Sequence, residues 1–217
     1  EVSGQGEQYP QGWSIINMTV DKLKIDNLQL QSLLAKPWQA PPVHISHINS
    51  LDLLNADIEY GDWHWQNLEL SLENASLPLS LWGTTAQLSL QADSVSFQDQ
   101  TAIEPRLNAT LKPGSIQLQE LSLDWQQGRV QVSGEFEPEH WKINNATISG
   151  LKWAIQPDDK VDWWQKATER LQQVDVKQLE IERSQVIQLS KQPYWQLSGL
   201  NLEGDQLEVK HNNGHWG

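Results

Sequence analysis

The sequence predicts a mainly β protein, an extended and curved antiparallel meander built from repeated hairpins, with one amphipathic helix near residues 158–174. Three observations predict this fold class. Apolar and polar residues alternate along most of the 217-residue chain, which is the period of a half-buried β-strand. One strand-turn-strand phrase occurs twice. A single segment has apolar residues at helical spacing instead.

The repeated phrase covers residues 51–70 and residues 179–202. Leu51 and Leu179 are 128 positions apart, whereas Trp65 and Leu197 are 132 apart, so the second copy has a longer turn. Each copy places its apolar residues on one face of the hairpin. A chain that repeats such a hairpin forms an extended sheet whose apolar face must be covered.

The strands follow one another along nearly the whole chain, separated by short turn signals such as Lys112-Pro-Gly-Ser and Gln127-Gly128. The clearest hairpin spans Gln117–Phe136, with its apolar residues on one face and Gln, Ser, Asp and Glu on the other. The predicted strands are 14–20, 22–30, 43–54, 63–72, 86–97, 106–111, 115–125, 129–136, 141–149, 151–155, 176–182, 186–189, 194–202 and 206–210.

The helix prediction rests on one apolar stripe after Pro157. The stripe recurs at intervals of three and four residues, as the buried face of a helix does. Asp158 or Asp159 would cap the first turn, where acidic side chains suit the helix dipole. The members of the stripe are Val161, Trp164, Ala167, Leu171 and Val174.

This helix precedes the second copy of the repeat, so it predicts a joint between two portions. The first β-rich portion is 1–157, and residues 158–217 form the helix and the start of a second β-rich repeat. The alternation still continues at Leu207–Lys210, shortly before the last residue. Both ends are therefore expected to be cuts through a longer protein.

Composition excludes several classes of function. The formal net charge is −13, with 15 Lys and Arg against 28 Asp and Glu, which disfavours a nucleic-acid partner. The absence of cysteine excludes disulfides and thiolate metal sites. No stretch reaches the run of about 18 apolar residues that spans a bilayer, and residues 1–4 do not resemble a signal peptide.

The size of the sheet leaves two architectures open. About a dozen strands spaced roughly 4.7 Å apart form a sheet about 55 Å wide. One helix, about 10 Å across, covers about two of them. Either the sheet closes on itself as a sandwich or barrel, or it curls into a groove whose lining is left for an apolar ligand.

The chain resembles the AsmA-like family of Gram-negative envelope proteins, and most of all its smaller, YicH-type members. The resemblance lies in the order of the hairpins, in the phrase Leu123–Gly134, in the helix after Pro157 and in the closing residues 211–217. It covers most of the chain from about Leu51 onward. The motifs are spacing patterns with few fixed residues.

The resemblance implies a periplasmic β-rich body, a β-groove, anchored in the bacterial inner membrane by an N-terminal helix. It also implies a part in phospholipid handling or transport and in outer-membrane homeostasis. The family has no catalytic residues to transfer, so we expect no enzymatic activity and no cofactor. Small members have shorter bodies than the bridge-like lipid-transfer relatives, so a complete bridge between two membranes is not implied.

The sequence itself contains no recognisable metal-binding or catalytic motif. The six histidines are scattered, and residues three apart in a strand point to opposite faces, which disfavours a metal site. Asp158, Asp159 and Asp162 are explained by helix capping. There is no phosphate-binding glycine loop and no nucleophile elbow.

The twelve tryptophans are the one compositional excess. Tryptophan suits positions with one apolar and one wet end, such as groove rims and sugar platforms. Trp125, Trp153, Trp164 and Trp195 are predicted to pack in the core. Trp63 and Trp65 share one strand face, while Trp38 and Trp82 are the better candidates for exposed contacts.

Two functions from different classes remain. The first is a non-enzymatic lipid-handling module that holds phospholipid acyl chains in an apolar β-groove. The second is an envelope assembly factor or interaction scaffold with a closed β core, which binds other envelope proteins; a carbohydrate-binding sandwich rests on the tryptophans alone. The candidate groove residues lie on the hairpin 118–136: Leu121, Leu123, Trp125, Val130, Val132 and Phe136.

Overall fold

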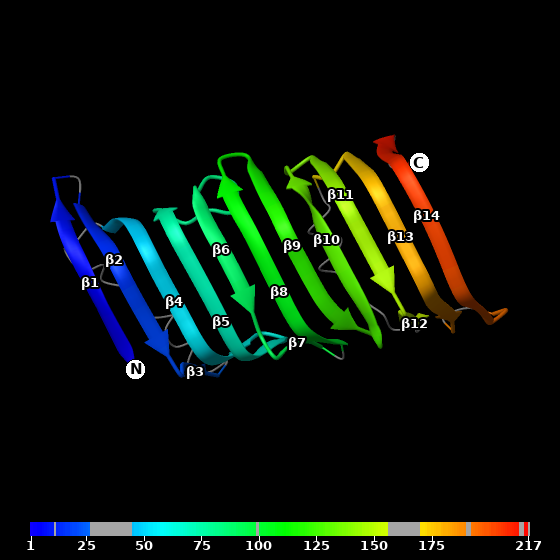
Figure 1. The fold of residues 1–217 in the computed structure, drawn as a ribbon, viewed down its shortest axis with the longest axis horizontal. Helices are drawn as coiled ribbons and strands as arrows, with labels where there is room; N and C mark the ends of the chain where they lie inside the picture. Colours follow the sequence, from blue (N-terminus) through cyan, green and yellow to red (C-terminus); the bar gives the residue numbers. More distant parts are fainter. Residues whose placement is uncertain are drawn as a thin grey trace. The chain divides into compact units, whose positions relative to one another are not determined.

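The computed structural model describes residues 1–10, 12–26, 45–98, 100–155, 170–189, 192–212 and 215–216. The chain forms two compact units, Glu1–Pro113 and Gly114–Gly217. Every regular element in the described ranges is a β-strand, as Figure 1 shows. The mainly β fold class is thereby confirmed.

The first unit is one sheet with the strand order β1-β2-β4-β5-β6-β8. The short strand β3 continues the sheet beside β4, and β7 lies between β5 and β8. The strands are β1 Val2–Tyr9, β2 Gly12–Asp21, β3 Lys24–Ile25, β4 Ile45–Tyr60, β5 Trp63–Ser76, β6 Ala86–Gln91, β7 Ser94–Phe97 and β8 Gln100–Lys112.

The second unit is also one layer of strands, in the order β9-β10-β11-β13-β14. Strand β12 pairs with β13, and β15 pairs with the end of β14. The strands are β9 Ser115–Trp125, β10 Gly128–Phe136, β11 His140–Ser149, β12 Lys152–Ile155, β13 Gln173–Gln188, β14 Trp195–Asn212 and β15 His215–Trp216.

Each unit contains one parallel pair of long strands, which a pure antiparallel meander does not have. Strand β2 runs parallel to β4, and β11 runs parallel to β13. Parallel neighbours cannot be joined by a tight hairpin, because the chain must first return to the end of the sheet at which the previous strand began. Strands β3 and β12 lie in these crossover connections, and each pairs in parallel with the far half of the next long strand.

Several predicted strand limits are wrong because a bulge or a residue with positive φ interrupts the alternation without ending the strand. Arg183 and Gln206 adopt positive φ, and the pairing of β13 with β14 shifts register around Arg183. A bulge adds one residue to one strand and displaces the pattern to the other face. The predicted pairs 176–182 with 186–189, and 194–202 with 206–210, are therefore single strands. Conversely, residues 86–97 form two strands, and β1 was not predicted.

The two units contain the same arrangement, which extends the repeat found in the sequence. Residues 2–58 correspond to residues 130–186 with the same cross-strand partners: Val2 pairs with Val20 as Val130 pairs with Ile148. Strand β5 corresponds to β14, because Leu53 pairs with Leu70 as Ile181 pairs with Leu202. Positive-φ residues recur at matching places: Asn55 with Arg183, Asn67 with Gly199 and Asn74 with Gln206.

The first unit has a small apolar core near the turn of the β4–β5 hairpin. Ala56, Leu68 and Ala92 are buried there, and neighbouring side chains pack against them. The positive φ at Asn55 and Asn67 places a bulge on each side of this core. The surrounding half-buried side chains are Leu23, Leu53, Ile58, Trp65 and Leu90.

The predicted helix 158–174 falls largely on residues 156–169, outside the described residues. Its C-terminal limit is wrong, because Gln173 and Val174 begin β13. Val174 pairs with Trp141 on one side and with Val209 on the other. Backbone hydrogen bonding to two strands holds this residue in an extended conformation, which overrides its place in the helical spacing. The predicted boundary at 157/158 also lies outside the described residues and stays a prediction.

Leu171, the last apolar member of the predicted stripe before β13, is buried, with 5% of its surface exposed. We expect Leu171→Asp to lower the free energy of unfolding by roughly 3 kcal/mol, because it places a carboxylate in an apolar environment without a partner. Gln172 is exposed, so Gln172→Asp should cost little. Urea unfolding of both variants checks this, and equal midpoints would show that Leu171 does not support the fold.

Candidate functional site

The six candidate groove residues lie on one face of the β9–β10 hairpin. Leu121 pairs directly with Val132, and Leu123 pairs directly with Val130. Residues directly opposite each other in a sheet point to the same side. All six side chains are half-buried, and each lies on a strand held by neighbours in the sheet.

Aromatic side chains extend both ends of this hairpin face. The ring of Phe136 meets the ring of Trp141 edge-on, with centroids 5.5 Å apart. The rings of Trp125 and Trp153 lie 6.2 Å apart at an angle of 49°. Both contacts join the hairpin to the strands that follow it, so the candidate residues belong to a larger apolar surface.

That surface continues across β11, β13 and β14, whose residues the site prediction did not include. The register carries the apolar face from Val130 to Ile148, from Ile148 to Ile181 and from Ile181 to Leu202. The signal was present in the alternation of these strands, but only the pairing shows which of their faces is shared. We call this surface the apolar face of the second unit; its other members include Trp141, Ile143, Ala146, Val174, Val176, Leu179, Val186, Leu197, Leu207 and Val209.

The first unit has an apolar face built in the same way. Met18 pairs with Leu51, and Leu51 pairs with Leu72. Leu72 then pairs with Leu88 on β6, which pairs with Ala109 on β8. Each sheet therefore has one apolar and one polar side, as the alternation predicts.

The apolar face of the second unit remains accessible to water in the described part of the chain. Leu202 is 42% exposed and Leu197 is 48% exposed, while the six hairpin candidates are half-buried. In a closed sandwich the inner faces of two sheets interdigitate and exclude water. The long strands of this unit instead form a single layer (Figure 1). The apolar face of the second unit is therefore a long apolar surface, and none of the residues named as its members is charged.

The tryptophans differ in their exposure and in their contacts. Trp63 and Trp65 stack on one face, with centroids 6.4 Å apart and 17° between the planes, as their spacing predicts. Trp125 is half-buried, but Trp153 and Trp195 are exposed, so the predicted core packing of these two is wrong. Trp82 is half-buried. Trp38 and Trp164 lie outside the described residues.

The opposite face of the second unit has hydrogen-bonded polar side chains. Gln173 donates to Asp175 Oδ1 at 2.9 Å, and His140 Nε2 lies 2.6 Å from Asp175 Oδ2. The amide of Gln173, followed by the imidazole of His140, holds the pKa of Asp175 below its ordinary value. These groups satisfy one another at the surface and provide no reactive group.

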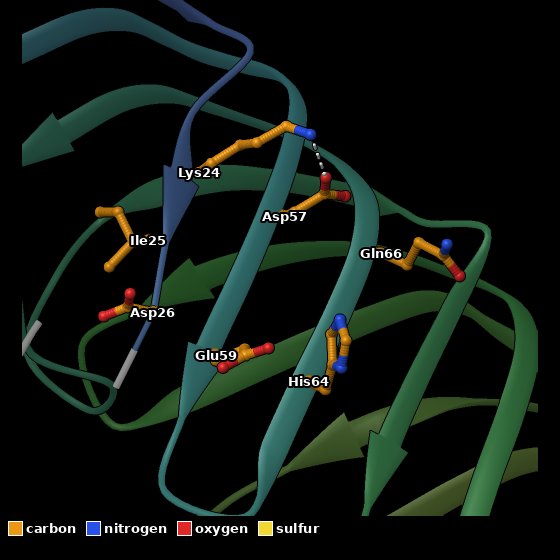
Figure 2. A pocket seen from close by; sticks show the side chains of 7 residues that line it. All are labelled: Lys24, Ile25, Asp26, Asp57, Glu59, His64 and Gln66. Atoms are coloured by element: carbon orange, nitrogen blue, oxygen red, sulfur yellow. Dashed lines mark ion pairs between the residues drawn. The ribbon is translucent and has the colours of Figure 1, made fainter. Parts of the chain in front are cut away.

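A polar pocket of about 350 Å³ lies in the first unit (Figure 2). Lys24 forms an ion pair with Asp57 there, with 3.4 Å between Nζ and Oδ2. The backbone N–H of Asn67 donates to Asp57, and this bond is the main reason why the pKa of Asp57 is lowered. The lining residues lie on β3, β4 and β5, except Asp26, which directly follows β3: Lys24, Ile25, Asp26, Asp57, Glu59, His64 and Gln66.

Charged and polar side chains line this pocket, and two of them, Lys24 and Asp57, are paired with each other. No group of three or more metal-ligating side chains suited to a metal ion occurs among the described residues. The described part of the chain also has no helix that is long and apolar enough to cross a membrane. Among the surfaces described above, the apolar face of the second unit combines a large apolar area with exposed side chains such as Leu197 and Leu202.

The family comparison covers the chain almost from end to end. A model of the AsmA family matches residues 1–216. The chain belongs to the AsmA family. Membership of this family supports an AsmA-like protein associated with the bacterial envelope.

One curated relative is much longer than the chain. The AsmA family protein YicH of Escherichia coli K12 is 22% identical over 221 residues, which cover 99% of this AsmA-family chain. The chain spans 38% of the length of that relative. No solved structure is significantly similar to the chain.

Proposed function

We propose that this AsmA-family chain is a non-enzymatic lipid-handling module of the periplasm that holds phospholipid acyl chains on its apolar faces. The observation that carries the proposal is the open apolar face of the second unit, which runs without a charged residue from the β9–β10 hairpin to β14. The family resemblance adds the expectation of a body anchored to the inner membrane in the full-length protein.

The energetics favour an acyl chain as the ligand. Moving one methylene group out of water contributes about 0.8 kcal/mol when it is fully buried. A chain lying along half-buried leucine, valine and aromatic side chains gains part of this value at each position, so several methylenes together offset the cost of immobilisation. The surface offers no hydrogen-bonding pattern to select one headgroup, which suits a carrier of the acyl part of a phospholipid.

Extraction of the purified protein tests this function. We expect organic-solvent extracts analysed by mass spectrometry to contain phospholipid in an amount comparable to that of the protein. A polar-surfaced protein of similar size, purified in parallel from the same cells, is the control for carry-over of membrane. Extracts no richer in phospholipid than those of the control would remove the lipid function and favour the envelope assembly factor or scaffold.

A further inference from the structure

The connection between β5 and β6 in the first unit, residues 77–85, has exposed leucines; we call it the leucine turn (Figure 1). Leu79 is 55% exposed and Leu81 is 57% exposed, and the half-buried Trp82 follows directly. No residue from Asn74 to Ala92 is charged. Single exposed leucines are common on protein surfaces, but a cluster of large apolar side chains on one uncharged turn indicates a contact surface.

The leucine turn is held in shape from inside by the buried Thr84. The hydroxyl oxygen of Thr84 accepts a hydrogen bond from the backbone N–H of Ser80 at 2.6 Å, and the hydroxyl donates to the carbonyl oxygen of Pro78 at 3.3 Å. The carbonyl oxygen of Ser80 accepts from the N–H groups of Gly83 and Thr84. Because these backbone groups are bonded within the turn, they need no water, which lowers the cost of moving the turn into an apolar layer.

Exposed aromatic side chains lie at the same end of the first unit as the leucine turn. The backbone N–H of Leu77 donates to Ser46 at the start of β4, where Ile45 pairs with Trp13 of β2. Trp13 is exposed, and so is Tyr9, which ends β1. Tryptophan and tyrosine have one apolar and one polar end, so they suit the boundary between water and a lipid bilayer.

The opposite end of the same sheet has a concentration of carboxylates. Asp57 and Glu59 lie on the last part of β4, Asp62 lies in the turn to β5, and Asp93 lies between β6 and β7. A carboxylate loses its hydration at high cost in an apolar layer and is repelled by anionic headgroups. The charge distribution of the first unit therefore favours the leucine turn over the acidic end as the contact for an apolar partner.

The small size of the exposed apolar surface favours a lipid bilayer over a protein partner. A stable protein interface buries about 800 Å² on each partner, and its anchoring side chains fill pockets on the other partner. Two leucines and a half-buried tryptophan on one turn offer much less area. A bilayer accepts such side chains without a complementary pocket.

We infer that the leucine turn is a bilayer-contact site, which inserts Leu79 and Leu81 among the lipids of a phospholipid membrane and places Trp82 at the boundary with water. The site lies in the first unit and adds a membrane contact to the proposed lipid function, on which the choice of a phospholipid surface in part rests. A contact of this size is weak and reversible, as exchange of lipid with a membrane requires.

A single fluorescent label tests the contact directly, because the chain has no cysteine. Ser80→Cys, labelled with an environment-sensitive fluorophore, should show a blue shift and a higher intensity when phosphatidylcholine vesicles are added. Nitroxide groups on the lipid acyl chains should quench this signal. The same label at Tyr60→Cys, an exposed position at the acidic end, should show neither effect.

Titration of the label at position 80 with these vesicles gives a partition coefficient that measures the contribution of the leucines. Leu79→Asp combined with Leu81→Asp should lower it roughly tenfold or more, because the burial of two leucines is lost and two carboxylates resist insertion. Tyr60→Asp combined with Ile103→Asp is the matched control. It removes two exposed apolar side chains and adds the same charge toward the acidic end of the unit, so the partition coefficient should stay unchanged.

Three results would overturn the inference. The first is a label at position 80 that does not respond to vesicles, and the second is a response that the changes at Leu79 and Leu81 leave unaltered. The third is a stable dimer in sedimentation that shields this label without vesicles, which would assign the turn to a second copy of the chain.

Lipid extraction separates this inference from the proposed function. Phospholipid in the extracts together with an unresponsive label at position 80 would remove only the bilayer contact. A responsive label together with extracts that contain no more phospholipid than the control would remove only the lipid-handling function.

Discussion

Leu123→Glu and Val132→Glu should each abolish most of the phospholipid bound by this chain while leaving it folded. Both side chains lie half-buried on the apolar face of the β9–β10 hairpin. A carboxylate there reaches water in the empty protein, but an acyl chain laid over it would bury the charge without a partner, which is strongly unfavourable. We expect the phospholipid-to-protein ratio to fall roughly tenfold or more, since each 1.4 kcal/mol changes an affinity tenfold.

Gln131→Glu is the matched control for these variants. Gln131 lies between Val130 and Val132 on the same strand, but it is exposed and faces the polar side. It adds the same charge to the hairpin without touching the apolar face, so the lipid content should stay at the wild-type value. Thermal melting beside lipid extraction separates the outcomes. Collapse of the melting transition in both Leu123→Glu and Val132→Glu, with no lipid on the wild type, would favour a closed core.

Gly134→Ala should destabilise the second unit by roughly 3 kcal/mol. Gly134 is buried in β10, at the point where the register with β11 shifts because β11 has an extra residue. An added Cβ would overlap the carbonyl oxygen of Lys142 and lie 3.0 Å from Ile143 Cα. Both neighbours are backbone atoms of a paired strand, so relief requires the strands to move apart. Urea unfolding should show the loss as a lower midpoint.

The repeat provides the matched control at Gly6, which occupies the corresponding place in β1. A Cβ at Gly6 would have Ser14 O as its nearest neighbour, at 3.4 Å, which is an ordinary contact. Gly6→Ala should therefore be neutral or slightly stabilising, because alanine has less conformational freedom to lose on folding. If Gly6→Ala and Gly134→Ala lowered the unfolding midpoint equally, the backbone contact of Gly134 would not be the cause.

The alternation of residue types was sufficient to predict which side chains share a face. Leu121, Leu123, Val130 and Val132 follow the period of two, and the observed register places them together. The repeated phrase was visible at Leu51 and Leu179 because both copies keep leucine at the positions that face the apolar side. Burial of one face constrains these positions directly, so the pattern survives in the sequence.

The full length of the repeat, unlike the repeated hairpin, could not be predicted from the sequence. Residues 1–50 have few identities with their counterparts, such as Trp13 with Trp141 and Ile15 with Ile143. The bulges at Asn55 and Arg183 share a positive φ although the residue types differ. Backbone geometry at such points depends on pairing with both neighbouring strands, and no single residue type is required for it.

The amino-acid sequence by itself therefore determined the fold class and the two-sided character of the sheets, because both follow from local periodicity. The strand neighbours were decided only by the tertiary structure. The parallel pairs β2–β4 and β11–β13 join segments more than twenty residues apart in the chain. The periodicity shows that one face of a strand is apolar, but it does not show which residues pack against that face. The exposure of Leu197 and Leu202 depends on which strands lie beside β14, and that is a property of the assembled sheet.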